Sequence, residues 1–317
     1  MTVTPSNGSN VMQQRWTPRN LLGIGLVLSL ITNIWLLSNW NSDSSLPDIK
    51  SSHSLIIDGP AKILKTCKAG PCADVASLDH LVMVPCHAVY IGSNLSDSAN
   101  ENNWYLEQHQ KGQVDVYLSH IRQGIQMLRE EGTILVFSGG QTRLPAGHRS
   151  EASSYWLVAD SMLWFGFNET LPDLPNRVTT EEFAKDSFEN LLFSICRFRE
   201  FTGRYPRRIT VVGFEFKRRR FESLHRRAIQ FPMSQFDYKG FDPPGTLLEE
   251  SELVHAVRPF EKDPYGCHQG SLLDKKIGRN PFNRYPPYEK SCPEIRHLLA
   301  YCPDDKTSLF TGKLPWL

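Results

Sequence analysis

The chain has 317 residues, of which 22% are charged and 11% aromatic, and its formal net charge at pH 7 is +1. This length allows one large domain or two modest ones, each with a full hydrophobic core. A net charge near zero argues against a general nucleic-acid binder, so no nucleic acid is expected as a partner. Positive charge is instead local, in the run Lys217 to Arg220 and the pair Arg226 and Arg227.

The N-terminal part of the sequence predicts one membrane span. Residues 1–19 contain no acidic side chain, and no charged side chain occurs between Arg19 and Asp43. The apolar stretch from Asn20 to Trp40 has the length of about 20 residues that a helix needs to cross a bilayer. It is longer than the core of a cleavable signal peptide, so we interpret it as an uncleaved signal anchor. A soluble helix and a mitochondrial presequence are the alternatives.

The predicted orientation follows from the charges beside this span. The arginines precede it, so residues 1–19 are expected in the cytosol and the rest of the chain across the membrane. The protein would then be a type II membrane protein of the ER or Golgi. Residues 41–77 read as a polar stalk, and Asn94 and Asn168 begin sequons that would be glycosylated in the lumen.

The cysteines predict disulfides if the chain folds in such a compartment. Cys67 and Cys72 are expected to pair across a Gly-Pro turn, with two unpaired thiols as the alternative. Cys292 and Cys302 flank a predicted helix that would hold them about 15 Å apart, which is too far for a bond. Cys267 is therefore expected to pair with one of these two.

Strands alternate with helices in residues 78–245, which predicts an α/β domain with a Rossmann-like, three-layer parallel sheet. Residues 246–317 are expected to form a C-terminal extension packed on this domain. The expected strands are 81–84, 134–137, 208–213 and 235–241, and the expected helices are 104–131, a helix from 150, 180–202 and 217–231, with a proline-rich loop at 171–178. In the extension we expect a helix at 247–260, an extended arm at 263–290 and a short helix from Ser291.

The expected strand at 134–137 leads into a turn of small residues, from Ser138 to Arg143, and then into a helix. Strand, glycine turn and helix is the geometry that presents backbone N–H groups and the positive end of a helix to an anion. An ordinary strand-to-helix connection with surface arginines is the alternative.

Polar groups follow several of the predicted strands at their carboxyl ends, where open α/β sheets bind ligands. The candidates for catalysis are His87, Glu151 and Asp186, and those for ligand binding are Ser138, Gly139, Gly140, Thr142, Arg143, Asn190, Glu215, Lys217 and Arg220. Alternatives remain: Glu151 and Asp186 could merely offset helix dipoles, the basic run could be solvated, and Cys86 is expected to be a small buried side chain rather than a nucleophile. No metal motif, P-loop or strict G-x-G-x-x-G occurs, and the cofactor is unknown.

From Leu81 to Phe241 the order of motifs resembles the membrane-anchored SanA/ElyC/YdcF-like group, also called domain of unknown function 218, and most of all its fungal and plant branch. The residues that carry the resemblance are Ser138, Gly139, Gly140, Ser150, Glu151, Ala152, Asp186, Ser187, Asn190, Arg220 and Arg226. The resemblance implies a Rossmann-like sheet, an N-terminal anchor and a link to cell-envelope processes. Bacterial members usually have a glycine-rich turn after the first strand, where this chain has Pro85, Cys86 and His87.

These observations predict a single-pass membrane protein whose lumenal domain binds an anionic small molecule, either a nucleotide or another phosphorylated compound. A hydrolase or transferase acting on the phosphate group is the first hypothesis. The alternative is a non-catalytic ligand-binding or scaffold protein of the secretory pathway.

Overall fold

The computed structural model of the chain describes residues 77–242 and 249–317. These ranges hold no helix that is both long enough and apolar enough to cross a membrane. The predicted span from Asn20 to Trp40 and the predicted Cys67–Cys72 bond lie outside them. Every described residue belongs to one compact unit, Ile57–Leu317.

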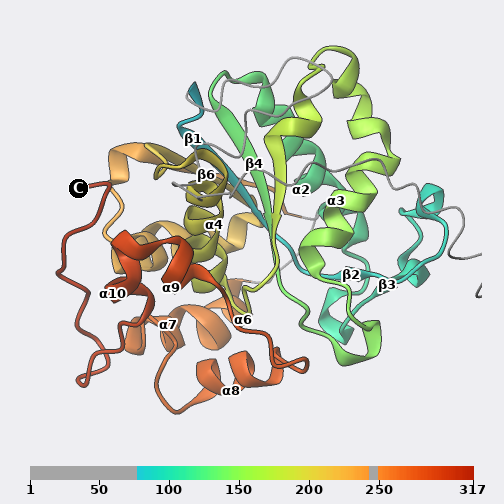
Figure 1. The fold of residues 1–317 in the computed structure, drawn as a ribbon. Helices are drawn as coiled ribbons and strands as arrows, with labels where there is room; N and C mark the ends of the chain where they lie inside the picture. Colours follow the sequence, from blue (N-terminus) through green and yellow to red (C-terminus); the bar gives the residue numbers. More distant parts are fainter. Residues whose placement is uncertain (1–76, 243–248) are drawn as a thin grey trace, which may run out of the picture. The chain divides into compact units, whose positions relative to one another are not determined.

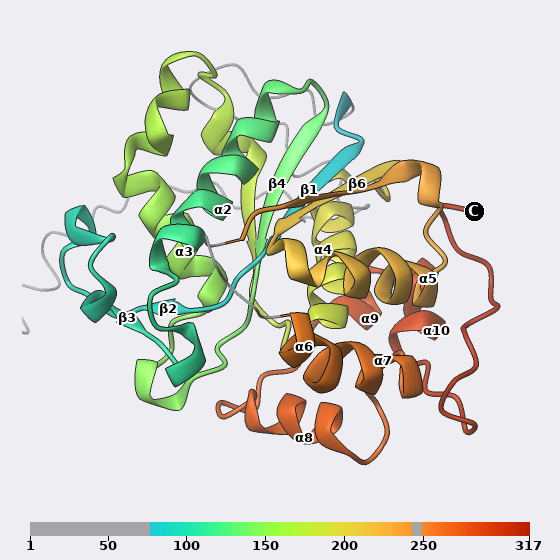
Figure 2. The same cartoon turned by 180° about the vertical axis from the view of Figure 1, so that it is seen from behind.

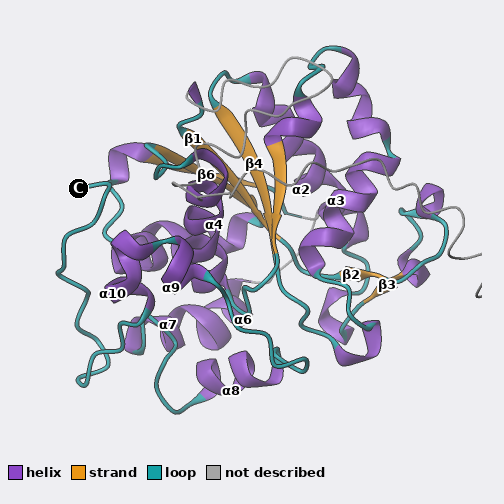
Figure 3. Cartoon of the chain, in the orientation of Figure 1, coloured by secondary structure: helices purple, strands orange, loops and turns teal. Residues whose placement is uncertain are grey.

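A sheet of five parallel strands forms the centre of this unit, so the predicted parallel α/β sheet is confirmed (Figures 1 and 3). The strands run in the order β5-β4-β1-β6-β7, and a separate two-stranded ribbon joins β2 and β3. Chain order reverses between β1 and β6, which is consistent with a Rossmann-like fold. The bounds are β1 His80–Pro85, β2 Val89–Tyr90, β3 Trp104–Tyr105, β4 Thr133–Ser138, β5 Val178–Glu181, β6 Arg208–Gly213 and β7 Phe236–Gly240.

Alternate residues of the central strands pack into two separate cores. In β1, Leu81 and Met83 face the core beneath α4, whereas Val82 and Val84 face the core beneath α2 and α3. Figures 1 and 2 show these helices on opposite sides of the sheet, which makes three layers. Both faces are covered, so the central strands β1, β4 and β6 are mostly apolar rather than alternating with polar residues.

Three helices of the α/β domain are long, whereas α5 and the helices of the C-terminal extension are short. The long ones are α2 Val114–Gln126, α3 Glu151–Ser161 and α4 Ser187–Thr202. The short ones are α5 Arg226–Ala228, α6 Glu249–Glu252, α7 Arg258–Lys262, α8 Ser271–Gly278, α9 Tyr288–Ser291 and α10 Arg296–Leu299.

The largest difference from the sequence prediction is β5. Val178–Glu181 pairs with β4 at the edge of the sheet, where we expected the end of a loop and the start of a helix. The strand has only four residues, and two of them are threonines, so it carries no clear apolar signal. Helix α4 therefore begins at Ser187, with Asp186 as its N-cap, rather than near residue 180.

Three other predicted helices are shorter or less regular than expected. Residues 104–105 belong to β3, and α2 begins only at Val114. The basic segment 217–231 contains a π-helical turn, Arg220–His225, before the short α5. The expected helix at 247–260 is likewise interrupted by a π-helical turn, Leu253–Val257.

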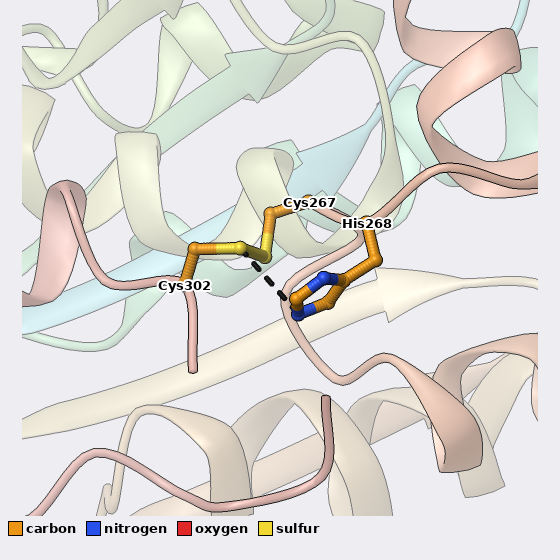
Figure 4. Close-up of side chains that lie close together, drawn as sticks. All are labelled: Cys267, His268 and Cys302. Atoms are coloured by element: carbon orange, nitrogen blue, oxygen red, sulfur yellow. Dashed lines mark hydrogen bonds between the residues drawn. A yellow bond between two sulfur atoms is a disulfide. The ribbon is translucent and has the colours of Figure 1, made fainter. Parts of the chain in front are cut away.

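The C-terminal extension is more helical than predicted and contains one disulfide. The expected extended arm includes α8 and α9, because its prolines and glycines lie between short helices rather than throughout the segment. Cys267 is bonded to Cys302, which confirms that it pairs with one of the two later cysteines (Figure 4). Figures 1 and 2 show α6, α7 and α8 beyond the end of the sheet to which the carboxyl ends of the strands point.

Candidate functional site

A cavity of about 280 Å³ lies at the carboxyl ends of β1, β4, β5 and β6. It adjoins the point between β1 and β6 where chain order reverses, which is where open α/β sheets bind ligands. Its wall combines residues after four strands with residues of α2, α6 and the end of α8. The residues lining it include Cys86, His87, Gln113, Tyr117, Thr142, Arg143, Glu151, Lys185, Asp186, Asn190, Phe214, Phe216, Lys217, Arg220, Glu252, His255 and Arg279.

Eight of the twelve candidate residues from the sequence analysis line this cavity: His87, Thr142, Arg143, Glu151, Asp186, Asn190, Lys217 and Arg220. Ser138, Gly139, Gly140 and Glu215 are not among its lining residues. Ser138 is fully buried, and its hydroxyl donates to Glu181 Oε2 over 2.7 Å. Glu215 is exposed and forms an ion pair with Arg218.

The two glycines of the turn shape the cavity without offering it their own amides. The N–H of Gly139 donates to the carbonyl of Glu181, and the N–H of Gly140 donates to the carbonyl of Ala184. A Cβ atom on Gly140 would lie 2.7 Å from the oxygen of Ala184, so only glycine fits at this backbone crossing. The two glycines thus hold the loop after β5 in place, and their own amides are not available to an anion.

Lys217 and His87 form the contact that distinguishes this cavity. Nζ of Lys217 lies 3.5 Å from Nδ1 of His87, and the ammonium also lies 4.8 Å from the centre of the Phe214 ring. Among the described residues no carboxylate forms an ion pair with Lys217. Burial, reinforced by the charge of Arg220, lowers the pKa of Lys217 to about 7. The side chain nevertheless keeps part of its surface open, as expected of a residue that lines a cavity.

His87 is held in its neutral form. Burial lowers the pKa of its imidazole well below the usual value, and the charge of Lys217 lowers it further. If Nδ1 accepts from Lys217, the proton of the ring is on Nε2, which is buried and has no hydrogen-bond partner in the part of the chain described. His87 can then offer one N–H to a ligand.

Glu151 is the carboxylate best placed for proton transfer. Ser150 caps the N-terminus of α3, which puts Glu151 in the first turn of that helix. The hydroxyl of Thr142 donates to Oε1 of the buried carboxylate. Burial raises the pKa of Glu151, and the hydrogen bond from Thr142 offsets part of that rise. A carboxyl group that retains its proton more readily than usual can act as an acid.

The other charged groups of the cavity mostly have partners. Arg143 forms an ion pair with Glu107, and Asp186 with Lys276. Arg220 Nε lies 2.9 Å from Glu252 Oε1, but the two atoms are not aligned for a hydrogen bond, so each keeps capacity for another partner.

Arg279, at the end of α8, is a residue that the sequence analysis missed. Its Nη1 donates to the carbonyl of Lys185, and within the described ranges it has no carboxylate partner. Glu252, His255 and Tyr117 were missed as well. Arg279 is some sixty residues from the basic segment and lies between proline and glycine turns. Its position in the sequence therefore gave no indication that it lines the cavity.

Cys86 lines the cavity as a buried free thiol, and burial raises its pKa well above the usual value, so it is poorly suited to act as a nucleophile. Elsewhere, Cys267, His268 and Cys302 gather in the extension, with Nε2 of His268 3.5 Å from Sγ of Cys302 (Figure 4). The two sulfur atoms are bonded to each other, so this group presents no thiolates to a metal.

The chain is similar to a protein of the yeast Saccharomyces cerevisiae that is called Uncharacterized protein YOR238W. The two are 30% identical over 294 residues, an alignment that covers 74% of this chain and 96% of the yeast protein. No family model matches the chain. No solved structure matches it either.

Proposed function

The chain belongs to the same family as the yeast protein YOR238W, and we propose that its α/β domain binds a small phosphorylated compound and acts on the phosphate group. The phosphate would lie between Lys217, Arg220 and Arg279, which approach the cavity from two different segments of the chain. The observation that carries this proposal is Lys217, a largely desolvated amine without a carboxylate partner in the described residues.

A desolvated ammonium is costly unless an anion lies beside it. In the free protein, Lys217 meets this cost by giving up its proton near pH 7. A bound phosphate removes the cost differently, because its oxygens accept hydrogen bonds from the ammonium and balance its charge. Arg279 adds a second cation with no carboxylate partner in the same ranges.

The volume of the cavity favours a compact ligand. A volume of about 280 Å³ lies just below the roughly 300–1,000 Å³ typical of ligand sites. Such a space suits a phosphate attached to a small organic group better than an extended dinucleotide. The rings of Phe214 and Phe216 provide an apolar surface for that group.

Action on the phosphate requires stabilisation of its charge and transfer of a proton. Lys217, Arg220 and Arg279 would stabilise the charge, which is the larger contribution in phosphoryl transfer. For the second we assign Glu151 as the acid that protonates the leaving oxygen, with the Nε2–H of His87 donating to a phosphate oxygen. The products would be inorganic phosphate and an alcohol if water is the acceptor.

The test is a binding titration of the full chain with inorganic phosphate, pyrophosphate and a sugar phosphate. Lys217→Met should weaken binding roughly 10-fold or more, as expected for loss of a charged hydrogen bond. Arg219→Ala is the matched control, because Arg219 is exposed and paired with Glu261 outside the cavity. Equal effects of the two variants, or no binding of any of the three probes, would overturn the proposal.

Phosphate release from the sugar phosphate separates an enzyme from a binding protein. Glu151→Gln should lower turnover roughly 100-fold or more while leaving affinity nearly unchanged, as expected for loss of a general acid. Binding without any turnover in the wild-type protein would favour the non-catalytic ligand-binding alternative.

We also propose that the domain lies in the lumen of the secretory pathway and that the chain is a distant member of the SanA/ElyC/YdcF-like group. The Cys267–Cys302 bond supports an oxidising compartment. Asn94 is exposed, so its sequon is accessible to glycosylation. Glycosidase treatment of the native protein should increase its gel mobility, and Asn94→Gln should remove part of that shift. An unshifted native band would reject the lumenal placement.

A further inference from the structure

Two buried thiols, one in α4 and one from the C-terminal extension, lie close to each other. Cys196 lies within α4 and Cys292 follows α9 in the C-terminal extension, and neither has exposed surface. Both are free and belong to the same hydrophobic core, and burial, with a contribution from Cys292, raises the pKa of the Cys196 thiol. They therefore approach closely without being joined.

Contacts on both sides of Cys196 fix this approach. One turn before it on α4, the ring of Phe193 packs against that of Tyr288, with centroids 5.0 Å apart. One turn after it, Nη1 of Arg199 donates to the carbonyl of Ser291 over 2.8 Å. Positions 193, 196 and 199 share one face of a helix, so the thiol lies in the middle of the surface that holds residues 288–292.

We propose that Cys196 and Cys292 form a second disulfide in the mature protein, made by exchange with a disulfide oxidant. The thiolate of one cysteine attacks the oxidant's disulfide, and one thiol leaves. The other cysteine then attacks the mixed disulfide and releases the second thiol. The protein loses two hydrogen atoms, and the oxidant, an oxidised glutathione or an oxidoreductase disulfide, gains them.

This bond would differ in effect from the disulfide already present. Cys267 and Cys302 both belong to the extension, so their bond closes a loop within it. A Cys196–Cys292 bond would join the extension to the layer beside the sheet. The bond would tie the segment around α9 to α4.

The buried position decides when the bond can form. Burial raises the pKa of the Cys196 thiol well above its usual value, which keeps the thiolate scarce in the folded protein. Formation is therefore expected while the chain folds, or when α9 moves away from α4. A protein folded in a reducing compartment should keep both thiols.

Peptide mapping of the full chain, produced through the secretory pathway, tests the proposal. The protein is denatured without reductant, alkylated, digested and analysed by mass spectrometry. We expect a cross-linked peptide pair containing Cys196 and Cys292, with Cys86 alkylated as an internal control. Alkylation of both Cys196 and Cys292, or a bond from either one to another cysteine, would overturn the proposal.

A stability measurement gives an independent readout that does not depend on ligand binding. Treatment with a dithiol should lower the unfolding temperature of the wild-type protein by about 5 °C more than that of Cys292→Ala, since a native disulfide is typically worth a few kcal/mol. Cys86→Ala, which removes another buried thiol, should respond to the dithiol as the wild type does. Equal responses of wild type and Cys292→Ala would contradict the second bond.

Discussion

Nζ of Lys217 lies 3.5 Å from Nδ1 of His87, and both side chains line the cavity at the carboxyl edge of the sheet. The charge of Lys217 lowers the pKa of His87, which burial lowers most, whereas the pKa of Lys217 is lowered first by burial and then by the charge of Arg220. The free protein therefore favours a neutral imidazole and an amine that loses its proton near pH 7. The protonation of Lys217 can therefore be tested by measurements across pH.

The first prediction concerns stability and pH. The folded protein releases the Lys217 proton near pH 7, whereas the unfolded chain keeps it up to about pH 10.4. Between these values the unfolded state binds more protons, so this group's contribution to stability rises with pH. The free energy of unfolding of the wild type, minus that of Lys217→Met, should increase from pH 7 to pH 9 by up to about 1.4 kcal/mol per pH unit.

Urea denaturation of both proteins without ligand, at several pH values, measures this difference. Subtracting the variant removes the contributions of all other titrating groups that the two proteins share. A difference that stays flat across this range would show that Lys217 is not desolvated in the folded state.

The second prediction concerns the buried pair of Arg220 and Glu252. Arg220→Ala leaves the carboxylate of Glu252 buried without its partner and should lower the free energy of unfolding by about 3 kcal/mol. The exposed pair of Arg219 with Glu261 provides the control, and Arg219→Ala should change stability by less than about 0.5 kcal/mol. Adding Glu252→Ala to Arg220→Ala should restore part of the loss. If the double variant is no more stable than Arg220→Ala, the unpaired carboxylate of Glu252 is not the cause of the lost stability.

The third prediction concerns the glycine turn. Gly140→Ala would place a methyl group 2.7 Å from the carbonyl oxygen of Ala184, a backbone atom that cannot easily move. Such overpacking should lower the free energy of unfolding by about 1–3 kcal/mol. Gly278→Ala in α8 meets nothing within 4 Å and should be neutral or slightly stabilising. A Gly140→Ala protein as stable as the wild type would show that the turn is not closely packed.

The sequence predicted the sheet because its long strands are continuous apolar runs. β1, β4 and β6 were placed within one or two residues of their bounds, and helix α4 was recognised by its apolar stripe. β5 was missed because an edge strand of four residues has too little periodicity to distinguish it from a loop. The helix after β6 was predicted, but its irregularity was not, because a π-helical turn leaves no mark in a pattern of apolar residues.

The sequence predicted the site residues that directly follow a strand, and it missed those that the C-terminal extension brings to the cavity. Lys217 and Arg220 follow a recognisable strand, so topology alone brings them to the sheet edge. Arg279 comes from the extension, whose packing depends on contacts such as that of Phe193 with Tyr288. The glycine turn was assigned to ligand binding because its residue types suit an anion. Sequence could not show that the carbonyls of Glu181 and Ala184 occupy the amides of its two glycines.

The reactivity of Lys217 toward an amine-specific reagent, followed by mass spectrometry across pH, tests the central claim most directly. The account predicts half-maximal labelling near pH 7, and protection when phosphate is added, with exposed Lys306 labelled equally in both conditions. Phosphate should also move the midpoint upward, because the bound anion stabilises the ammonium. A midpoint near the value of about 10.4 for free lysine, together with no protection by phosphate, would contradict the account.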